Sequence, residues 1–237
     1  MDAAIVTVGN ELLVGDTVNT NATWLCGRLD ERGVRVRRVT VVPDETGEIA
    51  RIVNEYNAEY DAVIVTGGLG PTHDDVTMEA VAAAFGRDVV ANEEAAAWLA
   101  EHGYSAEELT ERTTHLPAGC RPLPNEAGVA PGAVVETTYV LPGVPSEMKA
   151  MFEHVAEEFS GAPTYTRTVE AAEPESALLD RFTKLQERFD VTVGSYPGDG
   201  VRVKLTAGSE KEAERAAAWL TERVESPDSP ESPESSP

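Results

Sequence analysis

Residues 62–75 read Ala62-Val63-Ile64-Val65-Thr66-Gly67-Gly68-Leu69-Gly70-Pro71-Thr72-His73-Asp74-Asp75. The first five of these residues are apolar or β-branched, which is typical of a strand buried on both faces of a parallel sheet. The strand ends abruptly in a loop with three glycines, and a helix is predicted over 76–85. Because open α/β sheets bind ligands at the carboxyl ends of their strands, this loop is the leading candidate for a binding site.

The same alternation of strands and helices continues on both sides of this segment. It predicts an α/β fold with a doubly wound, mostly parallel sheet. Asn92 and Ser146 are expected to cap the helices that follow them, since their side chains accept hydrogen bonds from helical N–H groups. The further strands are expected at 3–8, 34–42 and 138–141, and the further helices at 19–32, 45–56, 92–102 and 146–159.

The pattern changes after Gly161-Ala162-Pro163. A strand, a helix, two strands around a Pro-Gly-Asp-Gly turn and a last helix predict a small α+β (βαββα) domain. The last residues contain only Ser, Pro, Glu and Asp, so they have no apolar side chain to bury and are expected to form a disordered tail. The expected division is 1–161, 162–224 and a tail over 225–237.

The chain is strongly acidic, with 42 Asp and Glu against 19 Lys and Arg, a formal net charge of -23. Nucleic acids and anionic membranes bind through basic residues, so neither is expected as a partner. There is no apolar run near the roughly 20 residues that span a bilayer and no basic leader, which favours a cytoplasmic location. A salt-rich cytosol would screen the self-repulsion, and an ordinary acidic protein is the alternative.

The glycine loop has the composition of an anion cradle. The backbone N–H groups of Gly67, Gly68 and Gly70 can approach a phosphate, and the next helix adds the partial positive charge of its N-terminus. The loop is neither a Walker A loop nor a Gly-x-Gly-x-x-Gly fingerprint, and a tight turn before a capped helix is the alternative. Asp74 and Asp75 would repel a phosphate unless a divalent cation such as Mg²⁺, Mn²⁺ or Co²⁺ bridges them, so a metal-assisted phosphate site is favoured.

Three other loops follow predicted strands and are expected at the same edge of the sheet. They are rich in amide, hydroxyl and carboxylate groups, which suits contacts to the nucleoside part of a ligand. One of their aspartates, Asp44, also has an ordinary interpretation as the N-terminal cap of the next helix. The candidate residues in these loops are Glu11, Asn19, Asn21, Asp44 and Gly143.

Several motifs together resemble a known family. The chain resembles the MoaB/MogA-type molybdenum-cofactor (molybdopterin) binding domain, and within that family it is most similar to the N-terminal domain of CinA. The resemblance runs from the first strand to about residue 152, and the small domain after it looks like the middle domain of CinA. The motifs are Gly9-Asn10-Glu11-Leu12-Leu13, Pro43-Asp44-Glu45, Gly68-Leu69-Gly70-Pro71-Thr72-x-Asp74-Asp75-x-Thr77, Asn125-x-x-Gly128 and Leu141-Pro142-Gly143-Val144-Pro145-x-Glu147-Met148.

The resemblance implies a three-layer α/β domain that forms a homo-oligomer, a trimer or dimer, and binds a small phosphate-bearing ligand. Asp44 and Asp75 match aspartates that serve adenylylation of molybdopterin in the MogA-type enzymes. CinA's N-terminal domain is instead associated with metal-dependent hydrolysis of ADP-ribose. Leu69 stands where the molybdopterin proteins usually have threonine, which weakens the pterin interpretation. The resemblance does not extend to the amidase domain of full-length CinA, so its nicotinamide-mononucleotide deamidase activity is not expected here. A separate amidase chain is a candidate partner.

These observations lead to three hypotheses. The first is a metal-dependent nucleotide pyrophosphatase of the ADP-ribose type, with Asp44 and Asp75 as catalytic residues and Asp74 and Asp75 at the metal. The second is molybdopterin binding and adenylylation, and the third is a non-catalytic nucleotide-binding module. The expected phosphate- or nucleotide-binding residues are Gly67, Gly68, Gly70, Thr72, Glu11, Asn19, Asn21 and Gly143.

Overall fold

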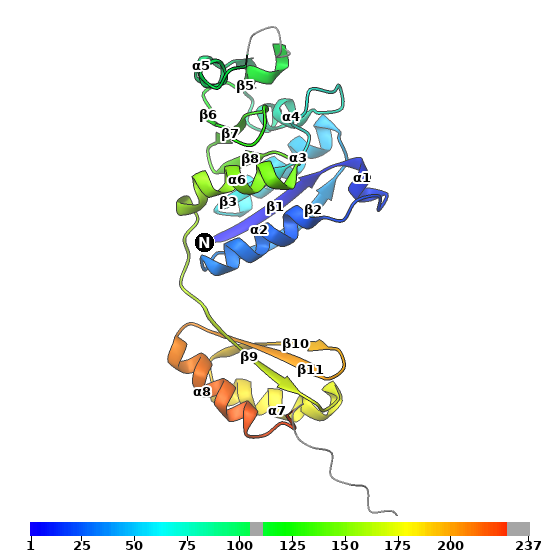
Figure 1. Ribbon diagram of the computed structural model, residues 1–237, viewed down its shortest axis with the longest axis vertical. Coiled ribbons are helices and arrows are strands. Elements are labelled where there is room, and N and C mark those ends of the chain that lie inside the picture. The colour runs from blue at the N-terminus through cyan, green and yellow to red at the C-terminus, as the bar shows by residue number, and fades with distance from the viewer. Residues whose placement is uncertain (105–110, 227–237) are drawn as a thin grey trace, which may run out of the picture. The chain divides into compact units, whose positions relative to one another are not determined.

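The computed structural model describes residues 1–104 and 111–226. The chain divides into two compact units, Met1–Gly161 and Ala162–Pro237 (Figure 1). From residue 227 onward, the tail expected over 225–237 lies outside the described residues. Within the described residues, the helices are too short or too polar for a membrane-spanning segment.

Each unit mixes strands and helices. The first unit contains β1 (Asp2–Val8), α1 (Asn10–Leu13), α2 (Thr20–Glu31), β2 (Arg35–Val42), α3 (Thr46–Glu59), β3 (Ala62–Thr66), α4 (Thr77–Ala84), β4 (Val89–Ala91), α5 (Glu93–Glu101), η1 (Glu111–Thr114), β5 (His115–Pro117), β6 (Arg121–Leu123), β7 (Gly132–Val135), β8 (Thr138–Leu141), α6 (Pro145–Val155) and η2 (Ala156–Glu158). The second contains β9 (Tyr165–Ala171), α7 (Glu175–Arg188), β10 (Val191–Pro197), β11 (Val201–Ala207) and α8 (Glu210–Thr221).

The main sheet has the strand order β2-β1-β3-β8-β7-β6. The first four strands are parallel to one another. β7 pairs antiparallel with β8, and β6 pairs antiparallel with β7. The expectation of a mostly parallel sheet is therefore confirmed. The register pairs Thr7 with Thr66 and Thr66 with Leu141, so β1, β3 and β8 end level with one another. The loops after these strands consequently emerge at one edge of the sheet.

Helices cover both faces of this sheet, as the alternation along β1 requires (Figure 1). Ala3 and Ile5 pack in one core cluster with residues of α2 and α6. Ala4 and Val6 point to the other face and pack with residues of α3 and α4. Because successive side chains of a strand point to opposite faces, a strand covered on both sides must be apolar throughout. The three-layer α/β architecture is confirmed.

Two details of the predicted elements are wrong. The last helix of the first unit starts at Pro145, with Val144 at the N-cap position and no side-chain cap, so Ser146 does not cap it. Proline is favoured at the first helical position because its missing N–H would have no partner there. This helix ends at Val155 and is followed by a 3-10 turn, where a helix to residue 159 was expected. Asn92 does cap α5, because its side chain accepts from the N–H of Ala95.

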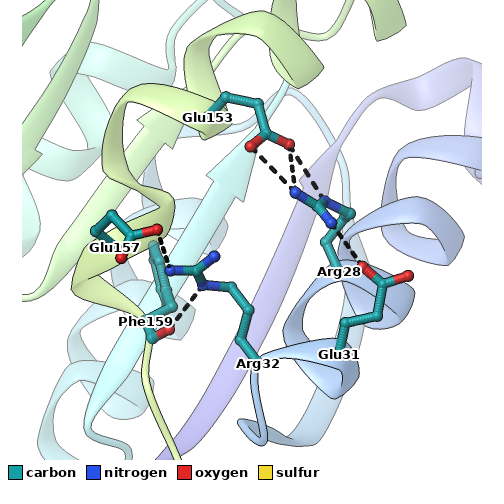
Figure 2. Close-up of polar contacts among 6 residues, drawn as sticks. All are labelled: Arg28, Glu31, Arg32, Glu153, Glu157 and Phe159. Carbon is teal, nitrogen blue, oxygen red and sulfur yellow. Dashed lines mark hydrogen bonds and ion pairs between the residues drawn. The ribbon is translucent and has the colours of Figure 1, made fainter.

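Arg28 of α2 and Arg32, the C-cap residue of this helix, tie α2 to α6 and to the segment that includes η2 on the same face of the sheet (Figure 2). Arg28 donates from Nε and Nη2 to the Glu153 carboxylate, at 3.2 and 2.8 Å to Oε1. Arg32 donates to the carbonyl oxygen of Phe159 at 2.9 Å and forms an ion pair with Glu157. Partly exposed pairs of this kind contribute at most about 1 kcal/mol each. Their effect is to fix the relative position of two helices that begin at the candidate site.

The second unit is a three-stranded antiparallel sheet of order β10-β11-β9, with α7 and α8 packed on it. Its core cluster includes Leu178 and Leu185 of α7 and Leu220 of α8. The βαββα order predicted for this part of the chain is the order observed.

A carboxylate that is mostly buried joins two ends of this unit. Glu173 is 9% exposed and accepts from Arg181 at 2.5 and 2.6 Å and from the N–H of Glu225 at 2.8 Å. The arginine and this N–H hold the pKa of the Glu173 carboxyl below its ordinary value, with Arg181 the larger cause.

The change Glu173→Gln is expected to destabilise the second unit by about 2 kcal/mol at neutral pH, because it removes a charged partner of Arg181. The pKa of the Glu173 carboxyl is lower in the folded than in the unfolded state. Its contribution to stability is therefore present above the unfolded pKa and is lost as pH falls through the folded pKa. The difference from wild type should therefore narrow below about pH 4. Amide hydrogen exchange of β9–β11 measures it, and Glu214→Gln, which removes an exposed partner of Arg167, is the control. Equal losses in the two variants would contradict the assignment.

Candidate functional site

A pocket of about 680 Å³ lies at the carboxyl ends of β3 and β8. It brings together the glycine loop, the start of α4, the 3-10 turn η1 and the loops on either side of the β7–β8 hairpin. Its size is that of a site for a nucleotide-sized molecule. The wall includes Gly68–Pro71, Asp75, Arg112, Gly128–Pro131, Pro142–Val144 and Glu147.

A smaller pocket of about 110 Å³ lies between the start of α1, the start of α2 and the same strand ends. Gly143 lines both pockets, so the two adjoin. The predicted binding residues are thus divided between them, with Gly68, Gly70 and Asp75 in the large pocket. Asp44, Thr72 and Asp74 line neither. The predicted residues in the small pocket are Glu11, Asn19, Asn21, Gly67 and Gly143.

The glycine loop is fixed by close approaches of backbone to backbone. Gly67 has a φ of 107°, and a Cβ there would lie 2.3 Å from the carbonyl oxygen of Val8. Its N–H donates to the carbonyl oxygen of Leu141 at 3.2 Å, so the prediction that this N–H binds a phosphate is wrong. The N–H groups of Gly68 and Gly70 meet no acceptor within residues 1–104 and 111–226. These two amides can therefore serve an anion.

Asp75 folds back onto its own loop. Its Oδ2 accepts from the N–H of Thr72 at 3.0 Å and also from the Thr72 hydroxyl. Both hydrogen-bonding donors of Thr72 are thus occupied by Asp75, and Thr72 does not line the pocket. A Cβ on Gly70 would lie 2.6 Å from the same carboxylate oxygen, which explains the third glycine. In the described part of the chain no hydrogen bond reaches Oδ1 of Asp75, which leaves this oxygen for a ligand.

Arg112 is a site residue that sequence reasoning missed. Its guanidinium donates to the carbonyl oxygens of Asp75 at 3.1 Å and of Thr72 at 3.4 Å, and it pairs with Glu79. Among the described residues it is the only Lys or Arg in the wall of the large pocket. Arg112 belongs to no recognised motif. It is 37 residues away from Asp75 in the sequence, and only the tertiary fold brings the two together. Its acidic surroundings were the only available signal.

Asp74 lines neither the large nor the small pocket. It is exposed, and its nearest basic neighbour is the fully exposed His73, at 3.6 Å. The nearby Thr72 side chain and the backbone N–H of Asp74 itself, with a smaller effect of His73, hold the pKa of the Asp74 carboxyl below its ordinary value. No group of three His, Cys, Asp or Glu side chains that could hold a metal occurs among the residues described. A divalent cation would therefore take most of its ligands from water and from a bound phosphate.

Asp44 joins two loops and does not cap a helix. Its Oδ2 accepts from the N–H of Asn10 at 2.9 Å, while the N-cap position of α3 is Glu45. The interpretation of Asp44 as a helix cap is therefore wrong. The carboxylate instead anchors α1, the short helix that carries Glu11.

The two asparagines of the small pocket differ in what they leave free. Asn19 caps α2 through Oδ1 and donates from Nδ2 to the hydroxyl of Thr7 at 2.9 Å, so both ends of its amide are used. Asn21 donates to the carbonyl oxygen of Gly143 at 2.7 Å and to the hydroxyl of Thr66 at 3.3 Å. Its Oδ1 is buried and has no partner among the described residues. Asn21 therefore presents an acceptor, and Asn19 has a structural role.

The comparisons with known proteins identify the family of the first unit. Residues 4–161 match the family described as "Probable molybdopterin binding domain". The chain belongs to this MoaB/MogA-type family. Residues 163–228 match a second family, described as "FAD synthase, middle domain".

Among solved structures, CinA of Thermoplasma acidophilum, a protein of unknown function, is 38% identical, with a TM-score of 0.62 over 68% of this chain and 99% of that one. A CinA-like first unit is thereby confirmed. An Archaeoglobus fulgidus protein is 37% identical over 92% of this chain and 95% of its own length. An Aeropyrum pernix protein is 40% identical over 94% of this chain and 91% of its own length. The homo-oligomer and the separate amidase chain stay predictions.

We expect Gly67→Ala to lower the free energy of unfolding of the first unit by about 2 kcal/mol or more, because of its left-handed φ and the nearby Val8 carbonyl. Gly27→Ala is the matched control. Gly27 lies within α2 with open space around its Cα, and alanine there should stabilise by about 0.5–1 kcal/mol. Urea unfolding measures both. A Gly67→Ala variant as stable as wild type would contradict the loop geometry.

Proposed function

We propose that the first unit binds a phosphate-bearing nucleotide or pterin in the large pocket. The observation that carries this proposal is the combination of two loop amides, Gly68 and Gly70, which have no acceptor among the described residues, with Arg112 in one pocket wall. Hydrogen bonds between such groups and a charged oxygen are worth about 1.5–3 kcal/mol each. A few of them can hold a phosphate locally although the chain has a net charge of -23.

The finer proposal is hydrolysis of a nucleotide diphosphate of the ADP-ribose type, assisted by a divalent cation. Bound beside Asp75, the cation would neutralise the diphosphate and lower the pKa of a bound water. Asp75 would offer Oδ1, because Oδ2 is held by Thr72. Gly68 and Gly70 would donate to charge that develops on oxygen bound to phosphorus. Asp44 would act at a distance, by holding the loop that carries Glu11.

The direct test is incubation with ADP-ribose and Mg²⁺, Mn²⁺ or Co²⁺ in buffer of high salt concentration, with AMP formation as the readout. FAD joins the panel because the second unit matches a domain of FAD synthase. A thermal-shift assay reports binding separately, since a ligand at 100 times its Kd stabilises by about 2.7 kcal/mol. Folded protein that neither binds nor hydrolyses any of these ligands would remove the proposal.

Asp75→Asn and Arg112→Gln separate binding from turnover. Arg112→Gln should weaken ligand binding about 10-fold or more, because the charge that faces the phosphate is lost. Asp75→Asn should keep the Thr72 contacts and the binding, yet reduce turnover by about 100-fold or more, because the carboxylate proposed to hold the cation is lost. Asp74→Asn should change turnover less, since Asp74 is exposed and does not line the pocket. Equal effects of the two aspartate changes would contradict the role given to Asp75.

The second candidate is molybdopterin binding, which the family description favours. It predicts that a fluorescent pterin copurifies with the protein and that ATP is consumed only when molybdopterin is present. Tight binding of either ligand without turnover would instead identify a non-catalytic binding module.

A further inference from the structure

Glu147, an acid in the first turn of α6, has an unusual hydrogen-bond partner. Such residues commonly accept from the N–H groups of their own helix or interact with its dipole. Glu147 instead extends to a distant loop, where its Oε2 accepts from Nδ2 of Asn125 at 2.7 Å. No hydrogen bond or ion pair to Oε1 of Glu147 occurs within residues 1–104 and 111–226. One carboxylate oxygen is thus fixed and the other is left for a partner.

Asn125 is itself held rigidly. It is 1% exposed, its Nδ2 also donates to the carbonyl oxygen of Ala130 at 2.9 Å, and its Oδ1 accepts from the N–H of Ala127 at 3.3 Å. Buried amides that are fully bonded in this way keep a single orientation. Asn125 therefore acts as a fixed donor that positions the carboxylate of Glu147.

Gly128 completes the arrangement. A Cβ on this residue would lie 2.3 Å from Oε2 of Glu147, so any side chain here would displace the carboxylate. Gly128 and Glu147 both line the large pocket, together with Arg112 and the glycine loop. The sequence motif Asn125-x-x-Gly128 thus has two structural roles: it makes hydrogen bonds within its own loop, and it contacts Glu147.

The chemistry of this carboxylate follows from its surroundings. It belongs to no group of three potential metal-ligating side chains in the described part of the chain. A carboxylate repels a phosphate and accepts hydrogen bonds from hydroxyl or amino groups. It is therefore complementary to the organic part of a phosphate ester whose anion lies at Arg112.

We propose that Glu147 selects the ligand of the large pocket by accepting a hydrogen bond from a hydroxyl or amino group of its organic part, with Asn125 and Gly128 as positioning residues. This inference rests on the proposed function. It restricts the ligand to phosphate esters that carry such a donor, and it separates them from inorganic phosphate and pyrophosphate.

The experiment compares the Kd values of the full chain and of Glu147→Gln for adenosine 5′-monophosphate and for pyrophosphate. Glutamine keeps an acceptor for Asn125 but offers an N–H₂ group in place of the second oxygen. Adenosine monophosphate should bind about 10- to 100-fold more weakly, and pyrophosphate should bind as in wild type. The control is Glu153→Gln, which removes an acid of the same helix that pairs with Arg28 and does not line the pocket.

Analogues identify the donor in the wild-type protein. The 2′-deoxy and 3′-deoxy monophosphates lack one ribose hydroxyl each, and purine riboside monophosphate lacks the amino group. One of these analogues should bind the wild-type protein more weakly than adenosine monophosphate, by the same factor that Glu147→Gln costs the parent nucleotide. The Glu147→Gln variant should bind this analogue and the parent nucleotide equally well. If the parent nucleotide binds and Glu147→Gln matches wild type, this inference fails alone. If no nucleotide and no pyrophosphate binds, the proposed function fails and this inference fails with it.

Discussion

Three strand ends meet at Gly67, and the candidate site depends on that meeting. Its N–H is bonded to Leu141 at the end of β8, and its Cα lies against the carbonyl of Val8 at the end of β1. A Cβ on Gly143 would lie 3.2 Å from the Cα of Gly67, so the loop after β8 also packs closely against Gly67. The two pockets lie on either side of this contact. Any displacement of Gly67 would therefore separate the groups that face a ligand.

The acidic character of the chain makes its few basic groups informative. Most arginines pair with acids on the surface, as Arg28 does with Glu153. Arg112 also pairs with an acid, Glu79, but it additionally bonds two carbonyl oxygens of the glycine loop. In the proposed function, attraction for an anion therefore arises at one wall of one pocket, from a guanidinium and backbone amides, rather than from the net charge of the surface.

The sequence was sufficient for the fold and for part of the site. The long apolar strands and amphipathic helices were predicted because their periodicity is a local property, and the bounds of β3 and β8 match the expectation. The three-residue strands β4, β5 and β6 are too short to show a period, and they were missed together with β7. The roles of Arg112 and Glu147 depend on contacts across 37 and 22 residues, which no local pattern encodes.

The bonded glycine loop also bears on the rate of ligand capture. Gly67 and Asp75 are held by the strand ends and by Thr72 before any ligand arrives, so these two residues do not have to become ordered during the encounter. A preorganised loop loses little conformational entropy on binding, and its association is set by diffusion and orientation. Differences in affinity among related ligands should consequently come from their dissociation rates and not from their association rates.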